Sequence, residues 1–272
     1  MDNLSILVVS CDAYSDLWDP FFKLFNQFWA DCPYSVYLQT NIKNYPSDAV
    51  KTIQVGKDID WSSNLITALD AIPTQHVLLL LEDFFLCQPV DTHRIKMLHD
   101  FISKRQAGYC RLVPKPPSDN MIHSKLNIGL IKPGENYRMS FQAGIWDRDI
   151  LKQLLKAGEN AWQAEMEGSR RSDQLTCDFL SVCKEDFNQW PLLYLNAVIK
   201  RKYTPEAVKF CVKNAVTLNL SAREVCSWYD QLRRKRFFRK TVSLMIRITR
   251  YLLGERFYAA MKNNVILRKV IY

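Results

Sequence analysis

The stretch HVLLLLEDFFLCQP, residues 76 to 89, is an aliphatic run that ends in two adjacent carboxylates, Glu82 and Asp83. A continuous apolar run of this length is typical of a strand that is covered on both faces. In parallel α/β sheets, ligands bind in the crevice outside the carboxyl ends of the strands. The two acids therefore mark the end of a buried strand, where we expect a ligand site.

Strand and helix patterns alternate around this stretch. Apolar runs predict strands at 5–11, 34–41, 50–56 and 76–81, and helical spacing predicts helices at 19–29, 60–72 (with Ser62 or Ser63 as its cap) and 90–105. Farther along, we predict a strand at 137–146, helices at 147–158, 159–169 and about 171–185, a last strand at 191–199, and then a helical tail. The order indicates a mixed, mainly parallel sheet flanked by helices.

Charge separates the end of the chain from the rest. The net charge of the 272 residues is +9, but residues 231–272 hold twelve Lys or Arg against one acid, Glu255, a local balance of +11. Such a concentration of positive charge is typical of a segment that attaches to an anionic surface. We therefore expect a catalytic domain at 1–202 and a helical, basic C-terminal extension at 203–272.

The start of the chain and its cysteines indicate a cytoplasmic protein. MDNLSILVV has no cationic region before its apolar run, so it does not match a secretory signal. The eight cysteines show neither C-x-x-C nor Cys/His ligand spacing, which favours reduced thiols. No segment has the roughly 18 uncharged apolar residues that are needed to span a bilayer.

The paired acids suggest a divalent cation. Adjacent carboxylates beside apolar residues repel each other and lose hydration, and Mg²⁺ or Mn²⁺ would relieve both costs. Mg²⁺ typically takes one or two protein carboxylates and leaves other positions to substrate phosphates. The alternative is that Glu82 and Asp83 cap the helix that begins near Val90, or pair with Lys or Arg.

The motifs ILVVSCD, DWSSNLITALDAI, LLLLEDFF, SFQAGIWDRDIL and ENAWQAE follow one another between residues 6 and 165. Their order and spacing resemble the nucleotide-sugar glycosyltransferases of GT-A fold that serve bacterial surface-polysaccharide synthesis (capsule or lipopolysaccharide). The resemblance covers about residues 5–200. It implies a GT-A-like catalytic domain that moves a sugar from a nucleotide-sugar donor to an acceptor, with inversion as the expected outcome.

The resemblance also implies a donor site. The family has an acidic D-x-D-like motif that holds metal and diphosphate, and EDFF stands in its place. Neighbouring residues point to opposite faces of a strand, so we expect one acid, Asp83 rather than Glu82, to face the crevice. Lys115, Arg111 or Arg138 could neutralise the diphosphate instead. Base and ribose are expected at strand ends, on Ser10, Asp12, Tyr14, Thr40, Asn41 and Trp61; the alternative is ordinary turn chemistry.

The acceptor side is expected near SFQAGIW and ENAWQAE. Gln142 and Trp146 offer an amide and an aromatic ring to a sugar, with Trp162 as a second ring, although either tryptophan could belong to the core. An inverting transfer needs a general base for the acceptor hydroxyl. We assign this role to Glu165, with Glu159 as the second choice; the alternative is that these acids form a solvated helix face.

When the basic segment at 231–272 is plotted as a helix, its residues form two stripes. Cations follow one side and apolar residues another, the pattern of a helix in a membrane interface. The candidate membrane residues are Arg236, Phe238, Lys240, Met245, Arg247 and Arg250. A helix packed on the domain, or an RNA-binding arm, is the alternative.

Two hypotheses follow for the whole chain. The first is a peripheral glycosyltransferase on the inner face of the cell membrane, with a lipid-linked glycan acceptor, an anionic membrane surface as partner and no nucleic acid. The second is an α/β binding module without enzymatic activity, which docks on nucleic acid or a partner protein through its basic tail. Binding of a nucleoside diphosphate separates the two.

Overall fold

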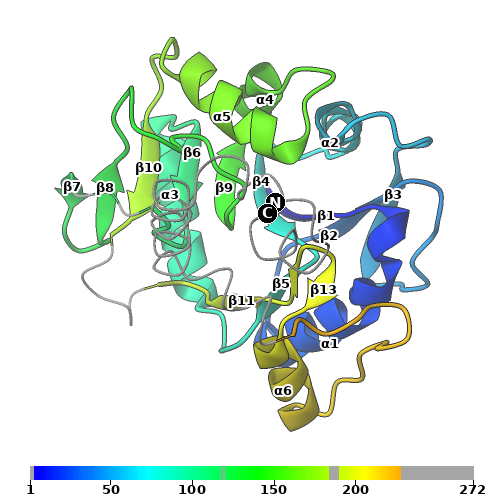
Figure 1. Ribbon diagram of the computed structural model, residues 1–272. Helices are drawn as coiled ribbons and strands as arrows, with labels where there is room; N and C mark the ends of the chain where they lie inside the picture. Colours follow the sequence, from blue (N-terminus) through cyan, green and yellow to red (C-terminus); the bar gives the residue numbers. More distant parts are fainter. Residues whose placement is uncertain (1–2, 117, 119, 184–189, 228–272) are drawn as a thin grey trace, which may run out of the picture.

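The computed structural model describes residues 3–116, 118, 120–183 and 190–227. Its centre is a nine-stranded sheet in the order β3-β2-β1-β4-β9-β6-β10-β8-β7 (Figure 1). The strands are β1 Leu4–Val9, β2 Val36–Thr40, β3 Val50–Gln54, β4 His76–Leu81, β6 Tyr109–Arg111, β7 Met121–His123, β8 Ile128–Leu130, β9 Gly144–Asp147 and β10 Phe179–Val182. Among these described strands, only β9 and β8 run against the others. The predicted mixed, mainly parallel sheet is confirmed.

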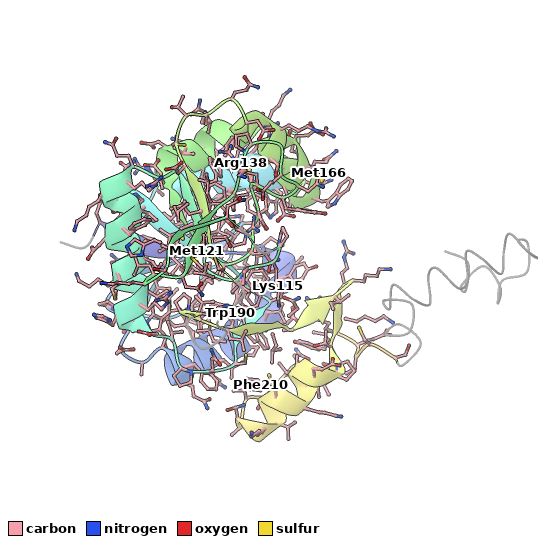
Figure 2. The ribbon with its side chains drawn as sticks, turned by 90° about the vertical axis from the view of Figure 1, so that its left-hand side faces the viewer. Lys115, Met121, Arg138, Met166, Trp190 and Phe210 are labelled. Atoms are coloured by element: carbon pink, nitrogen blue, oxygen red, sulfur yellow. The ribbon has the colours of Figure 1, made fainter. Side chains whose placement is uncertain are left out.

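Helices cover both faces of the sheet. They are η1 Asp12–Leu17, α1 Trp18–Phe28, α2 Trp61–Asp70, α3 Thr92–Arg105, α4 Arg148–Leu154, α5 Ala161–Ser172 and α6 Pro205–Lys213. Helices α2, α4 and α5 pack on one side of the sheet, and α1, α3 and α6 pack on the other (Figure 1). In the turned view of Figure 2, Met166 on α5 and Phe210 on α6 lie toward opposite ends of the molecule.

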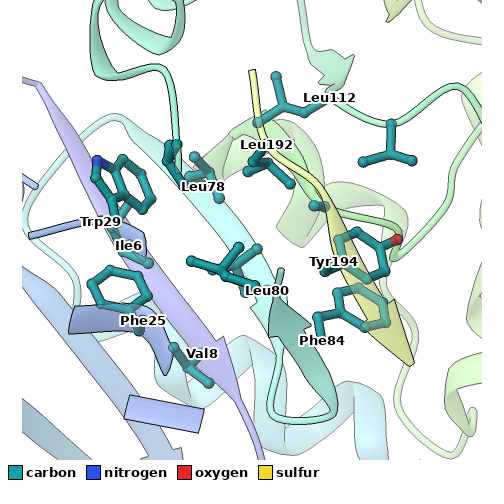
Figure 3. Close-up of a cluster of buried hydrophobic side chains, with 14 of the residues drawn as sticks. Ile6, Val8, Phe25, Trp29, Leu78, Leu80, Phe84, Leu112, Leu192 and Tyr194 are labelled. Atoms are coloured by element: carbon teal, nitrogen blue, oxygen red, sulfur yellow. The ribbon is translucent and has the colours of Figure 1, made fainter. Parts of the chain in front are cut away.

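The strands at the centre divide their side chains between these two layers. Ile6 on β1 and Leu78 on β4 belong to the buried cluster under α1 and α3, whereas Leu7 and Leu79 belong to the cluster under α2, α4 and α5. Successive side chains of a strand point to opposite faces, so a strand between two helix layers must be apolar throughout. This explains the unbroken HVLLLL run, part of which is visible in Figure 3.

Short strands outside the main sheet bring the end of the described chain back to β4. They are β5 Phe84–Leu86, β11 Tyr194–Asn196, β12 Val198–Ile199 and β13 Lys202–Tyr203. β11 pairs antiparallel with β5, and the rings of Phe84 and Tyr194 stack at 4.0 Å (Figure 3). This pairing carries the β12–β13 hairpin to the end of β4, next to the two acids.

Two predicted elements are wrong. The helix expected at about 171–185 is strand β10 from Phe179 on, because FLSV is a short apolar run, for which periodicity alone does not separate helix from strand. Of the strand expected at 137–146, only Gly144–Asp147 forms, as β9; the residues before it form an irregular segment in which Arg138 donates to the Ile131 and Ser172 carbonyls. Helix α2 is capped by Asp60, not by a serine.

The boundary expected at residue 202 divides the β12–β13 hairpin. Tyr203, Ala207 and Cys211 belong to the same buried cluster as β1, so the first part of the expected extension packs on the domain. A separate extension stays a prediction for 228–272, which lie outside the described residues. Within the described ranges, no helix has the length and apolar character that a membrane span requires.

Candidate functional site

A cavity of about 590 Å³ lies at the carboxyl ends of β1 and β4. Its wall comes from five stretches of the chain: the β1 end with Tyr14 of η1, Gln39 on β2, the loop before α2 with the first turn of α2, the β4–β5 turn, and the β12–β13 hairpin. The charged and aromatic residues on this wall are Asp58, Asp60, Glu82, Asp83, Lys200, Arg201, Tyr14 and Trp61. The position is the one at which open α/β sheets bind ligands.

Glu82 and Asp83 both line this cavity. The expectation that only one acid faces the crevice is wrong, because β4 ends at Leu81 and the acids form the turn into β5, where strand alternation no longer applies. Burial and the charge of Asp83 raise the pKa of Glu82 to about 8, and burial raises the pKa of Asp83 to about 6. The raised values follow mainly from burial, which disfavours the charged form of a carboxyl group.

Lys200 and Arg201 form the two-residue loop of the β12–β13 hairpin, and both line the cavity. Their φ angles are 49° and 66°, the left-handed region that a tight hairpin loop requires and that Asn and Gly normally occupy. For residues with a Cβ this conformation costs about 1 kcal/mol each. Sequence reasoning missed this pair, because IKRK lacks any Gly or Asn turn signal.

Arg223 holds this hairpin in place. Its guanidinium pairs with Asp16 through two hydrogen bonds of 2.9 Å, and its Nη1 donates to the Arg201 carbonyl at 3.0 Å. Tyr203 Oη donates to the same Asp16 carboxylate at 3.1 Å, and the Arg223 guanidinium lies 4.5 Å from the centre of the Tyr14 ring. Arg223 and Asp16 are 7% and 12% exposed. We call these contacts the Arg223 latch; sequence reasoning missed it, because no local pattern links residues 207 positions apart.

Three of the predicted donor residues, Ser10, Tyr14 and Trp61, line the cavity. Asp12 has a different role, because its carboxylate accepts from the backbone amides of Asn41, Ile42 and Lys43 at 3.0–3.3 Å. Asn41 accepts in turn from the Asp12 amide, and Thr40 donates to the Lys43 carbonyl. Asp12, Thr40 and Asn41 therefore shape the loop behind the site instead of lining the cavity.

Gln39 is a cavity residue that sequence reasoning missed. It is 2% exposed, and its Nε2 donates to the Ser10 carbonyl at 3.2 Å. Its Oε1 is buried without a hydrogen-bond partner among the described residues. Leaving such an acceptor unpaired is costly, so a polar group at the end of a buried strand is a signal for ligand contact.

The cations that were expected to face the diphosphate lie elsewhere. Arg111 is 1% exposed and donates to the Pro116 and Tyr137 carbonyls, and Arg138 is 3% exposed and holds Ile131 and Ser172. Both guanidinium groups therefore stabilise irregular backbone. Lys115 is exposed and is not among the residues that line the cavity (Figure 2). Among the described residues, Lys200 and Arg201 are the cations that line the cavity.

Glu165 is not among the residues that line the cavity, and it is linked to the lining residue Trp61 through Phe141. Its Oε1 accepts from Ser140 Oγ at 2.9 Å and from the Phe141 amide at 2.7 Å. The Phe141 ring packs on Trp61, with the ring centres 4.1 Å apart. Burial raises the pKa of Glu165, which makes the carboxylate a stronger proton acceptor. These two hydrogen bonds fix the side chain and leave Oε2 for other partners.

Glu159 does not fit the role of an alternative base. Both of its oxygens accept from Arg171 at 2.7 Å, in a bidentate pair that ties the start of α5 to its last turn. A carboxylate held in this way is a structural anchor. Trp162, by contrast, is 63% exposed on α5, one turn before Glu165, and its ring is free to cover an apolar ligand surface.

Of the two sugar-binding candidates in SFQAGIW, one is wrong. Trp146 is fully buried, stacks on Tyr109 at 3.9 Å and belongs to the cluster under α4 and α5, so it is a core residue. Gln142 is half-buried, and its Oε1 accepts from Tyr194 Oη. Its sugar contact stays a prediction. The tail candidates, residues 236–250, lie outside the described residues.

Within the described residues, no group of three or more His, Cys, Asp or Glu side chains has an arrangement that could hold a metal ion by itself. The acid pair nevertheless fits a hard divalent cation in chemistry, because two carboxylates plus phosphate oxygens from a substrate are a usual Mg²⁺ ligand set. None of the eight cysteines forms a disulfide in the part of the chain that the structure describes.

No family model and no curated protein matches the sequence. Among solved structures, S. aureus TarS 1-349 in complex with UDP is similar with a TM-score of 0.46 and 12% identity, over 80% of this chain and 66% of that chain. A cytidylyltransferase from Leptospira borgpetersenii serovar Hardjo-bovis has a TM-score of 0.45 and 11% identity, over 78% and 95%. The chain spans 60% of another TarS 1-349 chain and 46% of the longer S. aureus TarS chain. With TM-scores below 0.5, these likenesses show no family and no activity.

Proposed function

We propose that this chain is a glycosyltransferase that transfers a sugar from a nucleotide-sugar donor to a glycan acceptor. The observation that carries the proposal is the cavity at the ends of β1 and β4, which combines an acid pair, a cationic hairpin loop and two aromatic rings. A nucleoside diphosphate has a flat apolar base and a charged diphosphate, and it needs partners of these kinds.

The nucleotide would occupy the cavity with its base near the β1 and β2 ends. Tyr14 and Trp61 offer ring faces for stacking, and Gln39 Oε1 offers an acceptor to a base N–H. Ser10 adds a hydroxyl, although its Oγ already accepts from Trp18 Nε1 at 2.8 Å. A bound base would supply the partner that Gln39 Oε1 lacks among the described residues.

The diphosphate would lie between the acid pair and the hairpin loop. Glu82 and Asp83 would hold Mg²⁺ or Mn²⁺, which when bound neutralises charge on the departing diphosphate. The same cation would offset the cost of ionising the two carboxyl groups, whose pKa values are raised mainly by burial.

In the transfer step, the acceptor hydroxyl oxygen forms a bond to the anomeric carbon while the bond from that carbon to the diphosphate oxygen breaks. The bonding electrons leave with the nucleoside diphosphate, and the hydroxyl proton moves to Glu165. The Ser140 and Phe141 hydrogen bonds on Oε1 orient this carboxylate. Attack opposite the leaving group inverts the anomeric centre. Trp162 would cover the acceptor ring, and Gln142 would read its hydroxyls.

The acceptor is proposed to be a lipid-linked glycan at the inner face of the cell membrane, in surface-polysaccharide synthesis. The support is the +11 balance of residues 231–272, which suits an anionic membrane surface. Membrane attachment and chemistry should be separable along the chain, because every residue proposed to contact the donor or the acceptor precedes position 202.

A thermal-shift panel of UDP, GDP, dTDP and CMP, each with and without Mn²⁺, tests the proposal. At 100 times its dissociation constant a ligand stabilises the folded state by about 2.7 kcal/mol, which is readily measured. One nucleotide should raise the melting temperature, and Asp83→Asn should remove any Mn²⁺-dependent part of the shift. A protein that responds to none of them and binds oligonucleotides with steep salt dependence is a binding module instead.

A further inference from the structure

The loop of the β12–β13 hairpin is unusual in where it places charge. A two-residue loop with both residues at positive φ strongly prefers Asn and Gly, yet Lys200 and Arg201 stand there. Strained backbone of this kind persists where the surroundings enforce it, and it concentrates at ligand-binding sites. The positive φ angles and the cavity lining are separate observations, and both concern Lys200 and Arg201.

The surroundings that enforce the loop are the contacts of the Arg223 latch. Arg223 Nη1 donates to the Arg201 carbonyl, at the second loop residue, while Asp16 holds the guanidinium by two hydrogen bonds. Cys226 N donates to the Tyr203 carbonyl, and Tyr203 N donates to the Glu224 carbonyl, which fixes the other side of the hairpin. The loop is thus tied to η1, which lies directly after β1.

The loop lines the same cavity as the two acids. The positive charge of Arg223 is offset by Asp16, which accepts two hydrogen bonds from its guanidinium. Lys200 and Arg201 therefore supply positive charge to this cavity for an anionic ligand. Arginine offers a planar fork of donors to phosphate oxygens, and lysine a mobile point charge.

We propose that Lys200 and Arg201 are the diphosphate-binding residues of this protein, and that the Arg223–Asp16 pair is the positioning element that holds their strained loop over the cavity. The assignment rests on the proposed function for the nucleotide, but it makes a claim of its own. The ligand class is a diphosphate, so inorganic pyrophosphate is a sufficient probe without any knowledge of the base or the sugar.

The sharpest variant is the double change Lys200→Asn with Arg201→Gly. These residues are preferred in this loop type, and the Arg201 carbonyl that accepts from Arg223 is retained. We expect the melting temperature of the apo protein to rise by about 2–6 °C, since the strain is relieved. We also expect pyrophosphate affinity in isothermal titration calorimetry to fall by about 10²-fold or more, since two charge-assisted contacts are lost.

Lys209→Ala is the matched control, because Lys209 is an exposed lysine on α6 that does not line the cavity. It should bind pyrophosphate like the parent protein. If the double variant binds pyrophosphate as well as the control does, the assignment of Lys200 and Arg201 is overturned. If the variant loses affinity but its melting temperature falls, the loop is not strained by its side chains, and that part of the inference is overturned.

The positioning role is tested by Arg223→Lys and Asp16→Asn. Both variants keep a polar group at the latch but lose the bidentate pair, and both retain the loop cations. Pyrophosphate affinity should fall about 3- to 30-fold in each, whereas adding Arg223→Lys to the double loop variant should lower it no further, because Arg223 acts through the loop residues. A merely structural loss would lower the affinity in both backgrounds. Unchanged pyrophosphate affinity in folded Arg223→Lys would overturn the positioning role.

The loop assignment and the nucleotide-sugar function can be disproved separately. If the parent protein binds pyrophosphate but no nucleotide better than pyrophosphate, the phosphate site stands and the nucleotide-sugar function fails. If it binds a nucleoside diphosphate and the loop variants bind it equally well, the function stands and the loop assignment fails.

Discussion

Glu82 and Asp83 should make the protein less stable as pH rises, and removing their charge should reverse the effect. The folded-state pKa of Glu82 is about 8 against an ordinary value of 4.5. When the pKa of a carboxyl group is higher in the folded than in the unfolded state, the protonated group stabilises the folded state relative to the ionised group. Its contribution is therefore complete below pH 4.5 and is lost as pH rises through about 8.

The size of the effect follows from the same two values. Linkage gives about 5 kcal/mol for Glu82 when the carboxylate is fully ionised. The side chain is only half-buried by its accessible surface, and solvent screening reduces this figure to about 1–3 kcal/mol. Asp83, with a folded-state pKa of about 6, should contribute less. At pH 9, Glu82→Gln should raise the melting temperature by roughly 2–10 °C.

Thermal unfolding of the apo protein in EDTA at pH 5, 7 and 9 measures this effect. The difference between Glu82→Gln and the parent protein should be small at pH 5 and largest at pH 9. For Asp83→Asn the stability difference should develop at lower pH, because the folded-state pKa of Asp83 is lower. Asp48→Asn, at an exposed position, is the control. Transfer activity should be lost in Asp83→Asn despite the added stability. Parallel melting curves of Glu82→Gln and the parent protein across this range would refute the reasoning.

Three further predictions concern separate parts of the site. Glu165→Gln should keep nucleotide binding and lose about 10²- to 10⁴-fold in transfer rate. Glu167→Gln, at an acid of the same helix that pairs with Arg170, should retain the parent rate, and equal rates in the two variants would exclude Glu165 as base. Gln39→Met should weaken nucleoside binding in calorimetry but leave pyrophosphate affinity intact, and an unchanged nucleoside affinity would remove Gln39 from the base site. Removing residues 233–272 should release the protein from anionic vesicles in flotation while nucleotide binding persists, so continued flotation would contradict a membrane role of the tail.

Much of the fold could be predicted because its signals are local. The buried strands at the centre are unbroken apolar runs, and α1, α2 and α3 show helical spacing with clear ends. The β10 region failed for a physical reason: Phe179–Val182 is too short for its periodicity to distinguish strand from helix. What makes it a strand is its pairing with β6 and β8, which are distant in the sequence.

The site was predictable where strand ends alone determine position. Glu82, Asp83, Ser10 and Tyr14 follow buried strands directly, and the structure brings them to one cavity. The cations were not predictable in this way. Arg111 and Lys200 look alike in the sequence, and only tertiary contacts decide that one holds backbone carbonyls while the other lines the cavity.

Arg223 and the loop that it holds are synthesised after all the strands of the main sheet. The ribosome delivers all nine sheet strands by residue 182, but the hairpin loop comes only at 200–201 and Arg223 later still. All nine strands of the sheet are therefore synthesised before the loop that completes the cationic side of the cavity. A chain that ends near residue 213, just after α6, contains this loop but lacks Arg223, so it should bind a diphosphate about 3- to 30-fold more weakly than the complete chain.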